Sequence, residues 1–388
     1  MNKKIKRLLL LVVLSSNLAL TGCWDRTELE NRAFVMVVGI DEYDPEKSKV
    51  PDKYKVEKNE NNRLKMTYLL PKFSAVKQAE EGKDSRELLT SVGKTPYETT
   101  RQLTVRGDSK PFFQHMKAAV LGVDIVKNPE HFLEILDGLE RQDEISRKLH
   151  MFIAEDQASD ILQVESMLKP LSYKLQGMSQ GNIGTNLFIP RTLEETISST
   201  VQGATLIPKI TASKTEIKVA GSAVLKNSKF IGWLGAEETK AVAFLTQDAK
   251  QDIVQIEHEG VTIPYIIKGI RVKRTSKIED GRINMDINLT IKGNIQQYKV
   301  RKQPRFIDEK LIDDLEKIIN KTITLELNKT IDKLQNGMNA DVIDVGEYLQ
   351  GHEPDIWKQV EKDWNEVFPK VKINVKVDAY IDKVGSIK

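Results

Sequence analysis

Two segments in the C-terminal half of the chain alternate strictly between hydrophobic and polar residues. They are residues 283–291, with isoleucine, methionine and leucine at every second position, and residues 371–381. Alternation with a period of two is typical of a strand that has one buried and one solvated face. Both segments are therefore predicted to be strands of a sheet that buries one side.

A helical pattern separates these two strands. Apolar residues from Ile312 to Leu334 follow one another at steps of three or four, with a mean step of about 3.7. This spacing predicts a long amphipathic helix over about 307–334. The favoured interpretation is a helix packed across its own sheet, and docking to a helix of a partner is the alternative.

Shorter patterns predict the other elements. Strands are expected at 33–40, 63–70, 84–93, 117–122, 149–154, 217–225, 230–234 and 263–272, and helices at 95–103, 128–139, 193–201, 235–244, 342–349 and 354–367. The glycine-rich polar stretch 173–191 is expected to be a loop. The alternation of strands and helices indicates sheets covered by helices. The main domain boundary is placed near residue 205, which gives domains 23–204 and 205–388.

The N-terminus has the pattern of an export signal. Four cations lie within residues 3–7, an interrupted apolar run follows to Leu20, and small residues precede Cys23. The apolar run is shorter than the roughly 20 residues that a membrane-spanning helix needs. Residues 1–22 are therefore predicted to be a signal peptide, and the rest of the chain contains no other apolar stretch of that length.

The end of this signal resembles the bacterial lipobox. Leu20-Thr21-Gly22-Cys23 has the order leucine, small residue, glycine, cysteine. The resemblance implies cleavage between Gly22 and Cys23, a diacylglyceryl group on the Cys23 thiol and an acyl group on its new amino terminus. Two or more acyl chains anchor a protein stably to a bilayer. A plain secretory signal with an incidental cysteine is the alternative.

The cysteine count and the charge narrow the range of functions. Cys23 is the single cysteine of 388 residues, so an intramolecular disulfide and a thiolate zinc site are both excluded. The formal charge of +3 includes the four cations of the leader. Their removal leaves 55 Lys and Arg against 56 Asp and Glu, a net charge of −1. The mature chain therefore has no electrostatic case for binding nucleic acid.

Candidate catalytic motifs fail on spacing. The five histidines are scattered and form no H-E-x-x-H motif: His115, His131, His150, His258 and His352. Gly93-Lys94-Thr95 looks like the end of a phosphate-binding loop, but the required first glycine is replaced by Leu88. Arg106-Gly107-Asp108 is a three-residue match of the kind that arises by chance. We expect no catalytic, cofactor-binding or metal-ligating residues and no enzymatic activity.

Three glycines in the middle of the chain and the tryptophan after the lipobox each allow two interpretations. Gly177, Gly181 and Gly184 border either a ligand cleft or, as we favour, a flexible surface loop. Trp24 follows the lipobox directly, and it rests either at the headgroup level of the bilayer or against the first domain. The predicted strand at 33–40 begins about ten residues after Cys23, so the folded body is expected to lie close to the bilayer.

The chain resembles a known family along nearly its whole length. Gly22-Cys23-Trp24-Asp25 and the strand ending Val38-Gly39-Ile40-Asp41 resemble the Ger(x)C lipoproteins, which are the C subunits of nutrient germinant receptors of endospore-forming bacteria. The second half is similar to the same family at Gly221–Lys226, Gly232-Trp233-Leu234 and Glu237-Glu238. The C-terminal residues Trp357, Trp364 and Phe368-Pro369 also agree.

The resemblance implies a fold and a function. The family fold has several α+β domains, each with a mainly antiparallel or mixed sheet flanked by helices. Its members lie beside two integral membrane subunits, A and B, in the inner membrane of the spore, and are needed for nutrient-triggered germination. The resemblance supplies no catalytic residues to carry over to this chain. The alternatives from other functional classes are a stand-alone solute-binding lipoprotein with two similar lobes and a cell-wall hydrolase with a carboxylate pair.

Overall fold

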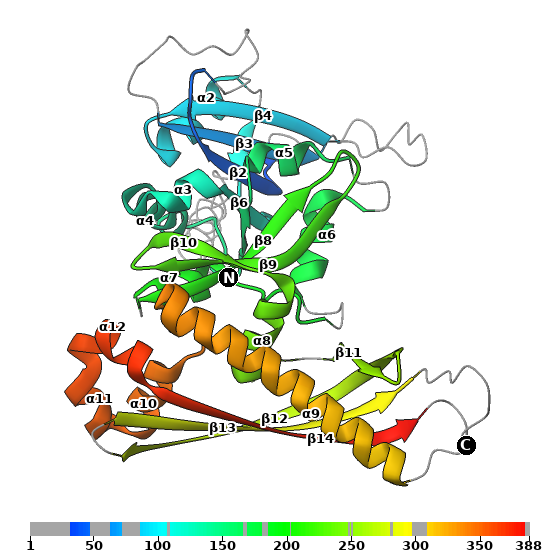
Figure 1. Ribbon diagram of the computed structural model, residues 1–388. Helices are drawn as coiled ribbons and strands as arrows, with labels where there is room; N and C mark the ends of the chain where they lie inside the picture. The colour runs from blue at the N-terminus through cyan, green and yellow to red at the C-terminus, as the bar shows by residue number, and fades with distance from the viewer. Residues whose placement is uncertain are drawn as a thin grey trace, which may run out of the picture.

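The computed structural model shows two layered units stacked on one another (Figure 1). One unit is built on an eight-stranded sheet and the other on a four-stranded sheet. The residues described are 32–46, 63–71, 86–106, 109–165, 169–180, 185–201, 203–246, 249, 251–279, 282–296 and 309–384. The predicted signal peptide and Cys23 lie outside them.

The first unit contains a mixed sheet with the strand order β10-β9-β8-β7-β6-β2-β3-β4. Its four central strands are parallel, and both flanks are antiparallel. The strands are β2 (Val37–Glu42), β3 (Leu64–Pro71), β4 (Arg86–Gly93), β6 (Ala118–Gly122), β7 (His150–Ala154), β8 (Ala204–Ala212), β9 (Ile217–Lys226) and β10 (Lys229–Leu234).

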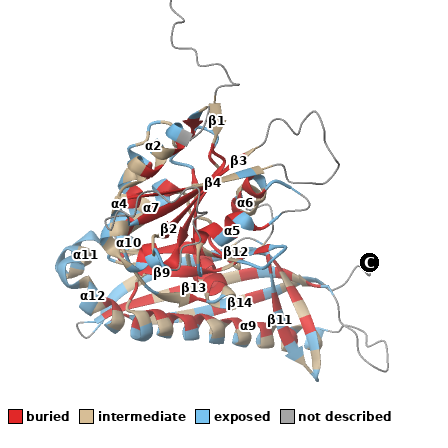
Figure 2. Ribbon diagram, turned by 90° about the horizontal axis from the view of Figure 1, so that it is seen from above, coloured by how far each residue is buried: buried red, intermediate tan, exposed pale blue. Residues whose placement is uncertain are grey.

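Helices cover both faces of this sheet, and each face has its own buried core. Apolar residues of α2 (Pro96–Arg106), α3 (Val123–Lys127), α4 (Pro129–Glu140) and α7 (Leu193–Val201) fill one core. Those of α5 (Ala158–Gln163) and α6 (Leu171–Ser179) fill the other. Figure 2 shows the buried residues concentrated along the strands between these layers.

The apolar run predicted as one strand at 33–40 is split between two sheets. β1 (Arg32–Phe34) pairs in parallel with β5 (Lys110–Phe112) in a small ribbon, and β2 starts at Val37. The backbone N–H of Val35 still donates to Phe112, whereas that of Met36 donates to Leu69 of β3. The prediction of a single strand is therefore wrong, because the chain changes hydrogen-bonding partner between Val35 and Met36.

The second unit contains a sheet with the order β11-β12-β13-β14. The strands are β11 (Asp252–His258), β12 (Val261–Glu279), β13 (Arg282–Ile295) and β14 (Lys372–Val384). β13 and β14 pair in parallel, while the other pairs are antiparallel. The two strands predicted from strict alternation are confirmed, and their apolar positions belong to the core of this unit.

Two helices cover the apolar face of the second sheet. α8 (Ala236–Thr246) connects the units, and α9 (Glu309–Asp332) lies across the sheet (Figure 1). Leu315, Ile319, Ile323 and Leu327 of α9 are buried. The long helix predicted at about 307–334 is thus confirmed, as is its packing on its own sheet. It ends in a π-helical turn, η4 (Lys333–Met338).

Short helices close the second unit, and they differ from the prediction in their bounds. α10 (Val345–His352), α11 (Pro354–Val360) and α12 (Trp364–Val367) replace the helices expected at 342–349 and 354–367. A 3-10 turn at Glu361–Asp363 separates α11 from α12, and a second at Phe368–Lys370 follows α12. Trp357 and Trp364 contact each other at 5.3 Å between ring centroids and pack, partly exposed, against the core.

The loop expected at 173–191 is wrong in its first part. Residues up to Ser179 belong to α6, which buries Leu171 and Leu175 against the first sheet. The helix is stabilised because these two apolar residues, one turn apart, pack against the sheet. Gly177 lies within this helix, while Gly181 and Gly184 lie outside the described residues.

The observed architecture confirms the predicted fold class of α+β units with mixed or antiparallel sheets and flanking helices. Residue 205, where the sequence places the main boundary, lies at the start of β8 inside the eight-stranded sheet. None of the helices in the described ranges is long and apolar enough to cross a membrane.

Candidate functional site

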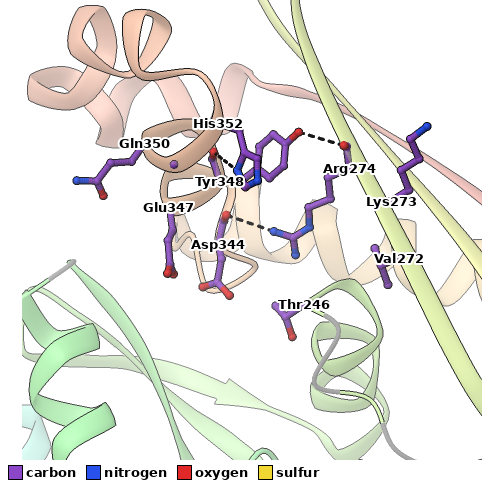
Figure 3. Close-up of a pocket in the computed structure, with 10 residues that line it drawn as sticks. Thr246, Val272, Lys273, Arg274, Asp344, Glu347, Tyr348, Gln350 and His352 are labelled. Atoms are coloured by element: carbon purple, nitrogen blue, oxygen red, sulfur yellow. Dashed lines mark hydrogen bonds between the residues drawn. The ribbon is translucent and has the colours of Figure 1, made fainter.

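A polar cleft of about 670 Å³ opens in the second unit, near its junction with the first (Figure 3). Its walls are the residues around α10, the middle of β12 and the C-terminal end of α8. Lining side chains come from Thr246, Val272, Lys273, Arg274, Asp344, Glu347, Tyr348, Gln350 and His352.

Arg274 connects the three walls of this cleft. Its guanidinium donates to the backbone oxygen of Asp344 at 3.3 Å and to that of Leu245 at the end of α8. The hydroxyl of Tyr348 donates back to the carbonyl oxygen of Arg274 at 3.0 Å. The ring of His352 stacks on Tyr348 with centroids 4.4 Å apart. These contacts hold α10 against β12 and leave Nε of Arg274 without a partner.

Two aspartates precede α10 and shape its start. The carboxylate of Asp341 accepts hydrogen bonds from the backbone N–H of Val345 at 3.0 Å and of Gly346 at 2.7 Å. It also accepts from Nε1 of Trp364 at 3.2 Å. Asp341 therefore caps the helix N-terminus, where backbone N–H groups have no intrahelical partner.

Among the residues that line the polar cleft, Asp344 has a strongly raised pKa. Burial, with Asp341 and Glu347 nearby, raises its pKa to about 6, although Arg274 and Arg191 act in the opposite direction. Its backbone is left-handed, with φ of 59°. Burial also raises the pKa of Asp341. A carboxyl that titrates near pH 6 gives this region a charge that depends on mildly acidic pH.

A second cleft of about 370 Å³ lies on the other side of α10, between the two units. Asp344, Glu347 and Gln350 line both clefts. From the first unit the second cleft adds Arg191 and residues around the start of β8. α10 thus separates two polar hollows at the junction of the units.

Two aromatic side chains of the polar cleft are engaged in hydrogen bonds with the backbone. Tyr348 and His352 both direct polar atoms to backbone oxygens, since Nδ1 of His352 lies 3.1 Å from the carbonyl oxygen of Tyr348. Within the described residues, no group of three or more His, Cys, Asp or Glu side chains is arranged to hold a metal ion.

The histidines singled out in the sequence do not come together. His115 contacts the rings of Phe34 and Phe112, and His131 contacts Glu42. The others lie at three separate places: His150 begins β7, His258 ends β11 and His352 ends α10.

The remaining sequence candidates have structural roles or lie outside the described residues. Thr95 caps α2, because its hydroxyl accepts from the N–H of Glu98 at 3.2 Å. The Gly93-Lys94-Thr95 match is therefore a helix cap. Cys23 and Trp24 lie outside the described residues, as do Gly107 and Asp108. The prediction of lipid on Cys23 stays a prediction.

Among the residues that line the polar cleft, His352 alone was singled out in the sequence. Asp341 and Asp344 fall at the start of the helix predicted at 342–349, which in fact begins at Val345. Two aspartates three residues apart, just before an apolar helical pattern, are the signal that identifies this helix start. Arg274 shows no signal, because its partners come from Leu245 and Asp344, far away in the sequence.

Asp41 and Gly39, which belong to the segment that resembles the Ger(x)C lipoproteins, lie where β2 meets α5. The carboxylate of Asp41 accepts hydrogen bonds from the N–H of Ala158 at 2.6 Å and of Ser159 at 3.0 Å, at the start of α5. Nζ of Lys65 lies 3.3 Å from the same carboxylate. A Cβ atom on Gly39 would lie 3.3 Å from the backbone of Ala158, so glycine permits the close approach of α5.

Residues of the second half that resemble the Ger(x)C lipoproteins also constrain how the backbone turns and packs. Gly221 has φ of +81°, and a Cβ atom there would lie 2.5 Å from the carbonyl oxygen of Leu234. Glu238 accepts a hydrogen bond from the N–H of Gly235 at 2.7 Å and thereby caps α8. A Cβ atom on Gly346 would lie 3.1 Å from both Trp357 and Trp364. These residues determine how the elements pack.

Both halves of the chain match domain models of spore germination proteins. Residues 25–212 match the model of a spore germination protein N-terminal domain, and residues 220–385 match that of the spore germination B3/GerAC-like C-terminal domain. Spore germination protein B3 of Bacillus subtilis is 24% identical over an alignment of 379 residues, and the match covers 95% of this chain and 96% of that protein. Spore germination protein A3 of the same organism is 22% identical, with 95% of each chain covered.

A solved structure has the same fold. The crystal structure of the GerBC protein superposes with a TM-score of 0.60 at 20% sequence identity, covering 84% of this chain and 96% of that chain. The two family models together cover nearly all residues after the predicted signal. The relatives match over almost their full lengths. The chain therefore belongs to the GerAC-like family of spore germination proteins.

Proposed function

We propose that this protein is the lipid-anchored C subunit of a nutrient germinant receptor, which acts without enzymatic activity beside the integral membrane subunits A and B. The observation that carries the proposal is the lipobox Leu20–Cys23 at the head of a chain that belongs to a spore germination family. The proposed location is the outer face of the spore inner membrane.

The position of the folded body supports an anchor of this kind. The first described strand, β1, begins at Arg32, nine residues after Cys23. A chain of nine residues spans at most about 30 Å when fully extended. An acylated Cys23 would therefore hold the first unit near the bilayer, where a two-dimensional search raises its effective concentration toward membrane subunits.

The anchor is tested by the variant Cys23→Ser. We expect the variant to leave the membrane fraction and to weaken nutrient-triggered germination, because serine accepts no thioether lipid. Gly22→Ala is the matched control, since it keeps a small residue before the cleavage site and should keep the protein on membranes. Mass spectrometry of the N-terminal peptide should find the diacylglyceryl group in the control only.

Membrane retention of Cys23→Ser at the level of the parent protein would overturn the anchor. Co-purification from spore membranes tests the partnership separately. Subunits A and B are expected to be recovered with this protein, and their absence from a membrane-retained preparation would contradict the receptor assignment.

A stand-alone solute-binding lipoprotein requires two similar lobes around a cleft. Here the two units contain an eight-stranded mixed sheet and a four-stranded sheet, with different strand orders. No pseudo-symmetric pair of lobes is formed by the described residues. We therefore propose no second function.

A further inference from the structure

The solvent-exposed face of α2 presents two large apolar side chains. Tyr97 is 76% exposed and Val105 is 79% exposed, and the exposed Arg101 and Thr104 lie between them. At 100° per residue these four positions fall within an arc of about 100°. The opposite side of the helix buries Leu103 against the first sheet. We call the four exposed residues the α2 face.

The α2 face contains a cation and lacks acidic residues. The acidic residue of this helix is Glu98, whose carboxylate turns back to accept a hydrogen bond from the N–H of Lys94 at 2.9 Å. Tyr97, Arg101, Thr104 and the exposed Lys110 of β5 all border one groove of about 740 Å³ between α2 and α4. On the side of α2 and β5 the surface thus combines exposed apolar groups with two positive charges. The other side of the groove, on α4 and the residues that follow it, carries Glu134, Asp137, Arg141 and Glu144.

This surface lies beside the strand where the described chain begins. β1 pairs with β5, which packs against α2. Figure 2 shows β1 and α2 next to each other at one end of the molecule. Arg32 of β1 stacks over the ring of Phe112 in β5, at 4.4 Å from its centroid, and adds a third cation near Lys110.

We propose that the α2 face, together with Lys110, rests against the lipid bilayer. The inference rests on the proposed lipid on Cys23, whose nine-residue connection to Arg32 limits the separation between lipid and β1 to about 30 Å. Tyrosine is enriched at the headgroup level, where its ring is apolar and its hydroxyl is hydrated. Arg101 and Lys110 are attracted to anionic headgroups. The acyl chains would thus keep the first unit close to the bilayer, and the α2 face would determine which side of that unit faces the bilayer.

The single native cysteine makes a direct test possible. Because the thiol of Cys23 is blocked when acylated, Val105→Cys has one free thiol for a nitroxide spin label. Leu325→Cys is the matched control, since Leu325 is likewise a highly exposed apolar residue on a helix, 68% exposed, on the second unit's α9. Both full-length lipidated variants are reconstituted into vesicles of phosphatidylethanolamine and phosphatidylglycerol.

The readout is the collision rate of the label with oxygen, which partitions into the bilayer, relative to a water-soluble nickel chelate. We expect this ratio to be several-fold higher at position 105 than at position 325. Adding Arg101→Glu to the Val105→Cys variant should lower the ratio, because a carboxylate is repelled by phosphatidylglycerol.

The outcomes separate this inference from the anchor itself. If the protein fails to float with the vesicles and Cys23 takes up label, the anchor is wrong. If the protein floats but positions 105 and 325 are equally exposed to the nickel chelate, the anchor stands and the inference about the α2 face is overturned.

Discussion

Single carboxylates determine how the C-terminal helices of the second unit pack. Asp341 caps α10 and reaches the indole of Trp364, while Asp344 adopts a left-handed backbone just before the helix. Both carboxyls have raised pKa values because burial disfavours their charged forms. Their ionisation therefore couples the fold of this corner to pH.

Asp344 predicts a defined pH dependence of stability. Its pKa is about 6 in the folded protein and 3.8 as the ordinary value, so the folded state binds more protons between these values. Its stabilising contribution is present below about pH 4 and is lost as the pH rises through 6. We expect Asp344→Asn, which tolerates φ of 59°, to match the parent protein at pH 4 and to be about 2 kcal/mol more stable at pH 7.

Urea unfolding at pH 4, 5.5 and 7 measures this difference. Asp355→Asn serves as the control, because the side chain of Asp355 is 95% exposed. A difference between Asp344→Asn and the parent that does not change with pH would contradict the assigned burial of Asp344.

At the scale of elements, a buried ion pair joins β2, β3 and α5. Asp41 and Lys65 are both buried, and Lys65 also donates to Gln157 at 2.8 Å and to Ser159 at 3.0 Å. A Cβ atom on Gly122 would lie 2.5 Å from Oδ1 of Asp41, so this carboxylate also needs glycine on the neighbouring β6. One side chain of β2 thus contacts β3 and β6 of the first sheet and the start of α5.

Removing the charge of Asp41 is expected to be costly. Asp41→Asn leaves the ammonium of Lys65 buried without a counter-charge, and we expect a loss of about 3 kcal/mol in the free energy of unfolding. Asp124→Asn breaks the exposed pair with Lys127 on α3 and should change it by less than about 0.5 kcal/mol. Equal effects of the two variants in urea unfolding would show that the buried pair is not essential.

Elements with a long, regular pattern were predictable, and those defined by their neighbours were not. β13, β14 and α9 each bury one face over many residues, so their periods identify them. β8 contains Pro208 opposite a shift in register with β9, and its strand pattern is correspondingly broken. α5 is six residues long and depends on Asp41 for its N–H partners. The polar cleft likewise depends on contacts between distant segments.

At the scale of the molecule, polar contacts fasten the two units to each other. Nζ of Lys333 in η4 donates to both carboxylate oxygens of Glu238, at 2.7 and 2.8 Å, and to the carbonyl oxygen of Trp233 in β10 at 3.2 Å. Nζ of Lys226 in β9 donates to the carbonyl oxygen of Asn339, and Asp252 accepts from Asn186. The units should therefore move together under native conditions.

Lys333→Ala tests this fastening. We expect faster amide hydrogen exchange in β10, α8 and η4 and a loss of about 1 kcal/mol in stability, because the pair is partly exposed. Lys317→Ala, which removes an exposed pair with Asp314 on α9, should leave exchange at the junction unchanged. Unchanged exchange in Lys333→Ala would mean that apolar packing alone holds the units.

The parallel pairing of β13 with β14 has a consequence for how the second unit is formed. The side-chain amide of Asn374 in β14 donates a hydrogen bond to the carboxylate of Asp286 in β13, which is 88 residues away in the sequence. Closing so long a segment delays the contact relative to local hairpins such as β11–β12. Until β14 arrives, β13 exposes an unpaired strand edge that another molecule's β14 fits equally well. Refolding of this unit should therefore be slow and sensitive to protein concentration, with strand exchange between copies as its main error.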